Sequence, residues 1–207
     1  MKKLISLTAA VLLLFSLVSC KEKNREYDEK EVKTAAEKLI FESGELNGVL
    51  WGEGLEYDAE SRFKNGFYCP ATDVALEKLG ISDLDGLKEK CAGVFSSAYC
   101  DSIYNTVFSS FGDDDSVLGY ARYYQGEGFI MVFSKANVLL KDRVEYLFDT
   151  LSVKGAEGEK VFVTLSVKVT RGDKFQIQTV DIGLIEEADG WRIDTPTYLV
   201  YNEFLEN

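Results

Sequence analysis

Strict alternation of apolar and polar side chains between residues 160 and 170 constrains the fold more than any other feature of this chain. The apolar set is Val161, Val163, Leu165, Val167 and Val169, and the residues between them are mostly polar. A period of two is typical of a strand that turns one face to a core and the other to solvent. Antiparallel sheets commonly have one buried and one solvated face, so the pattern predicts such a sheet in the second half of the chain.

The segments around this strand supply the rest of the predicted sheet. We expect strands at residues 119–125, 128–134, 141–153, 160–170, 174–187 and 191–199. Gly126-Glu127, Arg171-Gly172-Asp173 and Asp189-Gly190 are turn signals between consecutive strands. Pro196 lacks a backbone N–H, which predicts that the last strand is an edge strand or ends there.

One of these strands has an irregular apolar pattern. Phe175 and Ile177 occupy odd positions, whereas Val180, Ile182 and Leu184 occupy even ones. A β-bulge near Gln178-Thr179 would bring all five side chains onto one buried face and would bend the strand. We therefore expect a bulge at that point.

The first half of the chain is helical in pattern. Apolar residues with helical spacing predict a helix over residues 26–42, which Ser43-Gly44 is expected to end. Ser82 is expected to cap a second helix, and Ser96 or Ser97 a third, in a segment that Phe111-Gly112 closes. Helices followed by antiparallel strands indicate an α+β fold, with N-terminal helices packed on a strongly curved sheet.

The chain shows no linker rich in serine or glycine, and it contains only two prolines. These features predict a single α+β domain over residues 31–207. Its helical part is expected over residues 31–112 and its antiparallel β part over residues 118–200.

The N-terminus carries an export signal. Lys2-Lys3 precede an apolar run over residues 4–18, which is too short for a membrane-spanning helix. The run ends in Leu17-Val18-Ser19-Cys20, which resembles the lipobox of bacterial lipoproteins. The resemblance implies that residues 1–19 are a signal peptide and that Cys20 becomes a lipidated N-terminus. The alternative is an ordinary secretory signal, with Cys20 a free thiol.

Lipidation at Cys20 would fix where the protein acts. Two acyl chains anchor a protein stably to a bilayer, whereas one chain holds it only marginally. The polar residues that follow, within 20–30, predict a short tether. The expected location is therefore the cell membrane on its extracytoplasmic side, with the lipid anchor as the contact to the membrane.

Charge and composition narrow the function classes. The net charge is −12, and loss of Lys2 and Lys3 with the leader makes it −14. Such a surface repels phosphate backbones, so no nucleic-acid partner is expected. The charge either confers solubility alone or forms an acidic face for a basic partner or a cationic wall polymer.

The chain contains no histidine. This excludes Ser-His-Asp and Cys-His nucleophile systems and most zinc sites. We predict no catalytic residues, no metal and no cofactor. With Cys20 lipidated, Cys69, Cys91 and Cys100 cannot all pair, so either one disulfide forms or all three stay reduced.

The order of elements over residues 82–199 resembles the NTF2-like group of cystatin-like α+β folds. The resemblance is carried by the Ala121-Arg122-Tyr123-Tyr124 hairpin, the long strands over 141–187 and the terminal segment 189–194. It implies a cone-shaped sheet that encloses a hollow. Candidate ligand or partner contacts are Trp51, Tyr123, Tyr146 and Trp191, while Asp149 and Asp181 face either the hollow or solvent.

Three functions remain open at this stage. The first is a non-enzymatic lipoprotein that binds an envelope protein or a small ligand, for example as an inhibitor or accessory factor of cell-envelope enzymes. The second is a pocket enzyme of the NTF2-like type that transfers protons with carboxylates and tyrosines. The third is a structural or chaperone-like role in the envelope. The oligomeric state is left open.

Overall fold

The structure is a computed structural model that describes residues 26–62, 66–109, 120–126 and 128–200. The predicted signal peptide, Cys20 and most of the predicted tether lie outside the described residues. The elements in chain order are α2 (Glu29–Leu50), β1 (Tyr68–Pro70), α3 (Asp73–Leu79), α4 (Leu84–Val94), α5 (Ser97–Val107), β2 (Tyr123–Gln125), β3 (Ile130–Phe133), β4 (Arg143–Glu157), β5 (Lys160–Arg171), β6 (Lys174–Glu187) and β7 (Gly190–Ile193).

The strands form two antiparallel sheets. One has the order β4-β5-β6-β7, and the other is a small sheet with the order β1-β3-β2. The α+β class and the antiparallel sheet predicted from the sequence are thus confirmed. The larger sheet is neither closed nor strongly curled, so the expected cone is not seen. Strand β1 also lies within the stretch expected to be helical.

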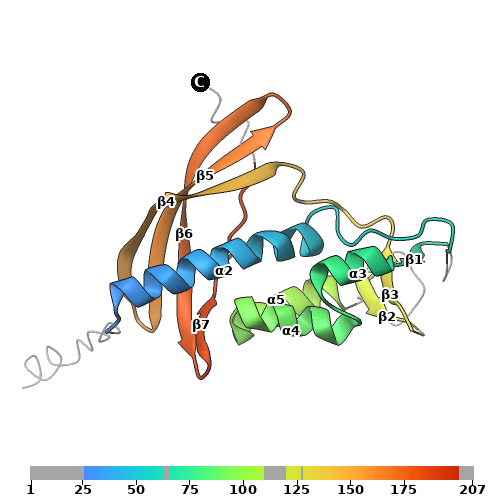
Figure 1. The fold of residues 1–207 in the computed structure, drawn as a ribbon, viewed down its shortest axis with the longest axis horizontal. Coiled ribbons are helices and arrows are strands. Elements are labelled where there is room, and N and C mark those ends of the chain that lie inside the picture. The colour runs from blue at the N-terminus through green and yellow to red at the C-terminus, as the bar shows by residue number, and fades with distance from the viewer. Residues whose placement is uncertain (1–25, 63–65, 110–119, 127, 201–207) are drawn as a thin grey trace, which may run out of the picture.

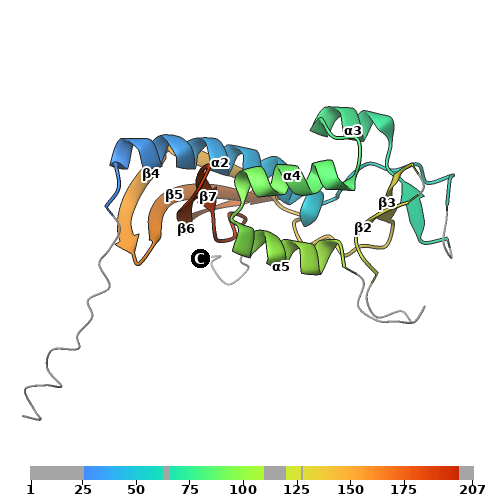
Figure 2. The same ribbon diagram turned by 90° about the horizontal axis from the view of Figure 1, so that it is seen from below.

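Helix α2 lies along one face of the four-stranded sheet, and the small sheet lies beyond its C-terminal end (Figures 1 and 2). Asp28 caps the helix by accepting hydrogen bonds from the backbone N–H groups of Lys30 (2.8 Å) and Glu31 (3.1 Å). This arrangement satisfies N–H groups that have no partner within the helix.

The predicted end of this helix at Ser43-Gly44 is wrong, because α2 continues to Leu50. A Cβ atom at Gly44 would lie 3.4 Å from Cε2 of Tyr146 on β4. Gly44 thus lies against the sheet at ordinary packing distance, within the helix. Ser43-Gly44 does not end the helix, because tertiary packing outweighs the low helix propensity of these two residues.

Strand β5 alternates between buried and half-buried residues over almost its whole length, as its sequence predicts. Its pairing with β6 is continuous, from Val161 opposite Leu184 to Arg171 opposite Lys174. The predicted bulge at Gln178-Thr179 is therefore wrong.

The change of apolar residues from odd to even positions along β6 has another cause. Phe175 and Ile177 lie on the outer face of the sheet, where they are 60% and 61% exposed. On the inner face at this end, Gln178 is half-buried, and its side-chain amide donates to the backbone carbonyl oxygen of Val200 at 3.2 Å. The apolar parity changes because glutamines occupy the inner face of β6 here, with Gln176 and Gln178 opposite the buried Val169 and Val167 of β5.

The bulge lies in β4 instead. Leu147 is opposite Ser166, but Ser152 is opposite Thr164, so β4 carries extra residues between these two pairs. The Thr150 hydroxyl oxygen accepts a hydrogen bond from the Ser166 N–H at 2.8 Å and so satisfies a donor of β5 at the irregularity. Before it, even-numbered residues such as Tyr146 face the core; Leu151 is buried within it, and Val153 packs against the core after it. A second register shift follows between Val153 and Gly155.

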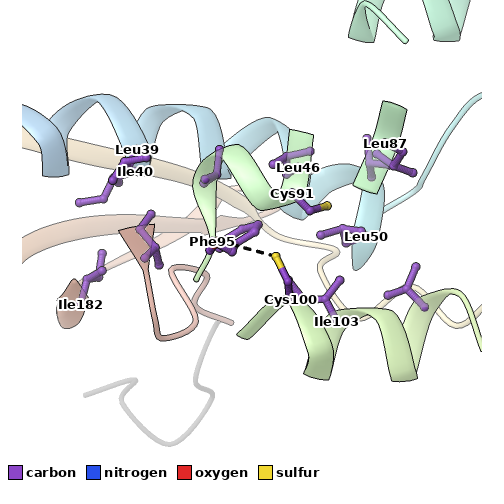
Figure 3. Packing of buried hydrophobic residues seen from close by; sticks show 14 of the residues in the cluster. Leu39, Ile40, Leu46, Leu50, Leu87, Cys91, Phe95, Cys100, Ile103 and Ile182 are labelled. Carbon is purple, nitrogen blue, oxygen red and sulfur yellow. Dashed lines mark hydrogen bonds between the residues drawn. The ribbon is translucent and has the colours of Figure 1, made fainter. Parts of the chain in front are cut away.

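Helices α4 and α5 complete the core. The side chain of Asp83 caps α4 by accepting a hydrogen bond from the Gly86 N–H at 2.8 Å. The predicted cap at Ser82 is therefore wrong, and the Ser82 hydroxyl donates to the Asp83 carboxylate instead. Ser96 caps α5, which is one of the two caps, Ser96 or Ser97, that the sequence predicted. Figure 3 shows side chains of α2, α4 and α5 packed together, with residues such as Leu50, Leu87 and Ile103.

The described cysteines are free thiols. Cys69, Cys91 and Cys100 are all buried, and none of the three forms a disulfide. Of the two alternatives that the sequence left open, the structure has the reduced one. Cys91 and Cys100 act as small apolar residues in the core between α4 and α5 (Figure 3).

Candidate functional site

A groove of about 1340 Å³ follows the C-terminal half of α2. Its walls come from α2, from α3 and from residues 138–146, which lead into β4. Figure 1 shows these three segments near the end of α2 that faces the small sheet. The groove thus unites parts of the chain that lie far apart in the sequence.

Backbone hydrogen bonds hold the walls in place. The carbonyl oxygen of Trp51, just after α2, accepts from the N–H groups of Leu139 (2.9 Å) and Leu140 (3.0 Å). The Thr72 N–H donates to the carbonyl oxygen of Glu56 at 2.9 Å, and the Thr72 side chain caps α3. Both flanking segments are therefore tied to the stretch that follows α2.

Large apolar side chains are exposed in the groove. Phe41 on α2 is 73% exposed and Val74 on α3 is 68% exposed, and both line it. Leu139, which is 52% exposed, lies between the lining residues Val138 and Leu140. Contiguous exposed apolar surface on a soluble domain marks interaction sites, whereas scattered single residues do not.

The charges on the two sides of the groove differ. Four carboxylates come from α2 and the segment after it: Glu42, Glu45, Glu53 and Glu56. The cations come from the other two walls. Lys78 lies on α3, Lys141 lies just before β4, and Arg143 is the first residue of β4. Asp142 also lines the groove, but the Arg171 guanidinium donates to both of its carboxylate oxygens, at 2.7 and 2.9 Å.

Beneath the groove, two side chains of the β2 region hold the end of α2. The Tyr123 hydroxyl donates to the carbonyl oxygen of Val49 (2.7 Å) and accepts from the Leu55 N–H (3.1 Å). Arg122, only 8% exposed, donates to the carbonyl oxygen of Gly52 and to the Tyr123 hydroxyl oxygen. These contacts fix the loop that forms the floor.

The structure places the predicted contact residues in different surroundings. Tyr146 lines the groove, and Tyr123 is fully buried below it. Trp51 is half-buried, with its ring centroid 6.2 Å from that of Tyr198. Trp191 lies near the other end of α2, where its indole N–H donates to Glu31 at 3.1 Å. Ligand contact by these residues stays a prediction.

Sequence reasoning missed the most exposed apolar residues of the groove, Phe41 and Val74. Phe41 follows Leu39 and Ile40 and lies off the apolar stripe of its helix. A large apolar residue on the polar side of an amphipathic helix is a signal that could have found this surface. Val74, on the short α3, offers no comparable periodicity because the helix has only 7 residues.

The inner face of the sheet around Tyr146 is filled. Thr197, fully buried, bonds to the side chains of Ser43 and Asn47, each at 2.8 Å, and its carbonyl oxygen accepts from the Tyr146 hydroxyl at 3.2 Å. Burial raises the pKa of Tyr146. The hydroxyl is thus engaged in a structural network of neutral groups.

The two aspartates considered for acid–base chemistry are both exposed. The ion pair and hydrogen bond with Lys154 lower the pKa of Asp181. Hydrogen bonds also lower the pKa values of Asp58 and Asp83. A carboxylic acid that donates protons near neutral pH needs the opposite shift, so these three groups do not suit that role.

Searches against protein-family models, curated proteins and solved structures found no match to this chain. Within residues 26–62, 66–109, 120–126 and 128–200, no three His, Cys, Asp or Glu side chains gather in a way that could hold a metal ion. None of the helices described there is long and apolar enough to cross a bilayer.

Proposed function

We propose that this protein is a membrane-anchored, extracytoplasmic lipoprotein without catalytic activity, which binds a protein partner in the groove along α2. The observation that carries the proposal is the exposure of Phe41 and Val74 within one groove of about 1340 Å³. An open groove of this size suits a segment of a protein better than a small molecule, which proteins enclose more completely. Exposed apolar anchors are the usual source of binding energy at such interfaces.

The position of the groove fits an anchor at Cys20. Helix α2 has 22 residues, which corresponds to about 33 Å at 1.5 Å per residue. It begins shortly after the lipobox cysteine, and the groove lies along its C-terminal half. A tether at the start of α2 would therefore leave the groove away from the attached end and open to partners in the envelope.

A role as inhibitor or accessory factor of an envelope enzyme is one version of this function. The acidic surface, with a net charge of −12 for the full chain, would speed encounters with a basic partner. Kinship with NTF2-like proteins stays a prediction, and the proposal does not depend on it.

Site-specific photo-crosslinking in living cells tests partner binding. A photoreactive phenylalanine analogue at Phe41 is expected to give a protein adduct. The same analogue at Phe175, which is 60% exposed on the outer face of the sheet, serves as the control. Absence of an adduct at position 41, or the same adducts at both positions, would contradict groove binding.

The anchor is tested separately. Cys20→Ala is expected to abolish incorporation of labelled palmitate and to release the protein from the membrane fraction, because no thiol remains to receive the diacylglyceryl group. A variant that is processed and retained in the membrane like the parent chain would disprove the anchor.

A further inference from the structure

We propose that the groove recognises a partner segment that carries apolar side chains along its centre and lysine or arginine along the edge that faces α2. This inference rests on the proposed function and names the chemistry of the partner at that same site. It follows from the way apolar and charged side chains are distributed across the groove.

The groove exposes apolar side chains from more than one wall. Phe41 and Val74, from two different helices, leave most of their side-chain surface to water in the absence of a partner. Each apolar Å² removed from water contributes about 25 cal/mol, so covering these side chains favours binding. A partner must therefore present apolar side chains to this part of the groove.

The α2 wall selects for positive charge. Glu45, Glu53 and Glu56 are exposed, and no ion pair of theirs occurs within the part of the chain that the structure describes. Glu42 contacts Lys38 at 3.8 Å, but both side chains are solvent-accessible, and such pairs contribute little. Lysine or arginine on the partner would complement this wall.

The wall formed by the segment that leads into β4 carries positive charge. Lys141 and Arg143 line it, while Asp142 between them is already bound to Arg171. A segment that is basic on every side would be repelled there. The basic residues therefore belong on one edge only, and the two walls together set the orientation of the segment.

The same charges disfavour two other kinds of occupant, a phosphate-bearing surface and a second copy of this chain. An anionic lipid surface or a nucleic acid would place phosphates against the glutamates of the α2 wall, which costs free energy. A second copy of this chain would bring together two surfaces of net negative charge. Both remain outcomes that the crosslinking experiment can reveal.

Three synthetic peptides provide a direct test. They share the same leucine and phenylalanine residues and differ only along one edge, which carries lysine, glutamine or glutamate. Fluorescence anisotropy measures their binding to the processed, full chain in vesicles of phosphatidylcholine, a lipid without net charge. We expect the lysine peptide to bind at least about fivefold more tightly than the glutamine peptide, and the glutamate peptide most weakly.

Variants show whether binding occurs in the groove. The double substitution Glu45→Lys/Glu53→Lys is expected to weaken binding of the lysine peptide about tenfold, which corresponds to 1.4 kcal/mol. Glu89→Lys/Glu159→Lys changes the net charge equally at exposed positions outside the groove and should have little effect. Equal losses in both double variants would overturn the inference, because the peptide would then be sensing net charge alone.

A second pair of variants tests how apolar side chains of the groove contribute to peptide binding. Phe41→Ser is expected to weaken binding about fivefold, whereas Phe175→Ser should leave it unchanged. Val74→Ser provides a second groove variant if Phe41→Ser reduces folding. If neither groove variant weakens binding, the inference is wrong.

The two proposals fail in different ways. If position 41 crosslinks to a partner but the lysine peptide binds no better than the glutamine peptide, the partner chemistry is wrong and the proposed function stands. If the adduct is a second copy of this chain or a lipid, both the inference and binding of a separate partner protein are wrong.

Discussion

The hydroxyl of Tyr123 donates a hydrogen bond of 2.7 Å to the carbonyl oxygen of Val49, in the last turn of α2. The last four carbonyl groups of a helix have no partner within the helix, and α2 has no basic side chain in its last turn. Tyr123 supplies one of the missing donors from a strand that is distant in sequence. The floor of the groove is therefore held by the β2 region as well as by α2.

Removal of this hydroxyl should destabilise the protein. Tyr123→Phe leaves the Val49 carbonyl, the Leu55 N–H and the Arg122 Nε–H without their shared partner in a buried setting. We expect the free energy of unfolding to fall by about 1–3 kcal/mol in a urea titration followed by circular dichroism.

Tyr57→Phe is the matched control. Tyr57 is half-buried, and its hydroxyl has no hydrogen bond within the described residues. Its removal should change the free energy of unfolding by less than about 0.5 kcal/mol. Equal effects of the two variants would show that the Tyr123 hydroxyl does not hold the end of α2.

Two glycines near the groove should respond to alanine in opposite directions. Gly54 has a φ of +87°, and a Cβ there would lie 2.6 Å from the Tyr123 hydroxyl oxygen and 2.7 Å from an Arg122 nitrogen. Gly54→Ala is expected to lower the melting temperature, because the backbone strain alone costs about 1–2 kcal/mol.

Gly48→Ala should raise the melting temperature. Gly48 lies within α2, and a Cβ there would meet no atom within 4 Å. Alanine in a helix interior is more favourable than glycine by about 0.5–1 kcal/mol. A destabilised Gly48→Ala variant, or an unchanged Gly54→Ala variant, would contradict the geometry of this loop.

The stability of the protein should decrease at alkaline pH, partly because of Cys91. Burial raises the pKa of the Cys91 thiol from its ordinary value of 9.0 to about 12. Above pH 9 the unfolded chain loses this proton while the folded chain retains it, so the free energy of unfolding falls between pH 9 and 12.

Cys91→Ala tests this linkage. The variant is expected to be less stable at pH 7.5 because it leaves a small cavity, but its stability should fall less steeply above pH 9, so the difference from the parent protein narrows. Urea titrations at pH 7.5, 9 and 10.5 compare the slopes of the two proteins. Equal slopes would show that Cys91 does not contribute to the alkaline decrease.

The local pattern of the chain predicted the elements whose determinants lie close together in sequence. The alternation over residues 160–170 predicted β5 and its buried face. Turn residues such as Asp189-Gly190 predicted the hairpins, because they adopt the required backbone angles with little strain.

The elements that local patterns misjudged are set by distant contacts. Helix α2 passes through Ser43-Gly44 because Ser43 bonds to Thr197, 154 residues away, and Gly44 packs against Tyr146. The bulge lies in β4 rather than β6, where Phe175 and Ile177 stay on the outer face and Gln178 takes the inner one, bonded to the carbonyl oxygen of Val200. No local window contains these partners.

The candidate site also has a part that the sequence indicated and a part that depends on contacts between distant segments. Tyr146 was selected from the sequence as a possible ligand contact and lines the groove, but the sequence predicted a hollow in the sheet and not a groove beside α2. The presence of Phe41 and Val74 in one groove, with glutamates on one wall and Lys141 and Arg143 on another, could not be predicted, because three segments must first pack around the end of α2.

The sequence by itself determined the acidic charge, the α+β class and the buried face of β5, since each depends on residue type and short-range spacing; the export signal stays a prediction from the same kind of local pattern. Only the tertiary structure decided the length of α2, the location of the bulge and the existence of a groove. These depend on which side chains meet across the core, and the free energy of that packing outweighs local conformational preferences.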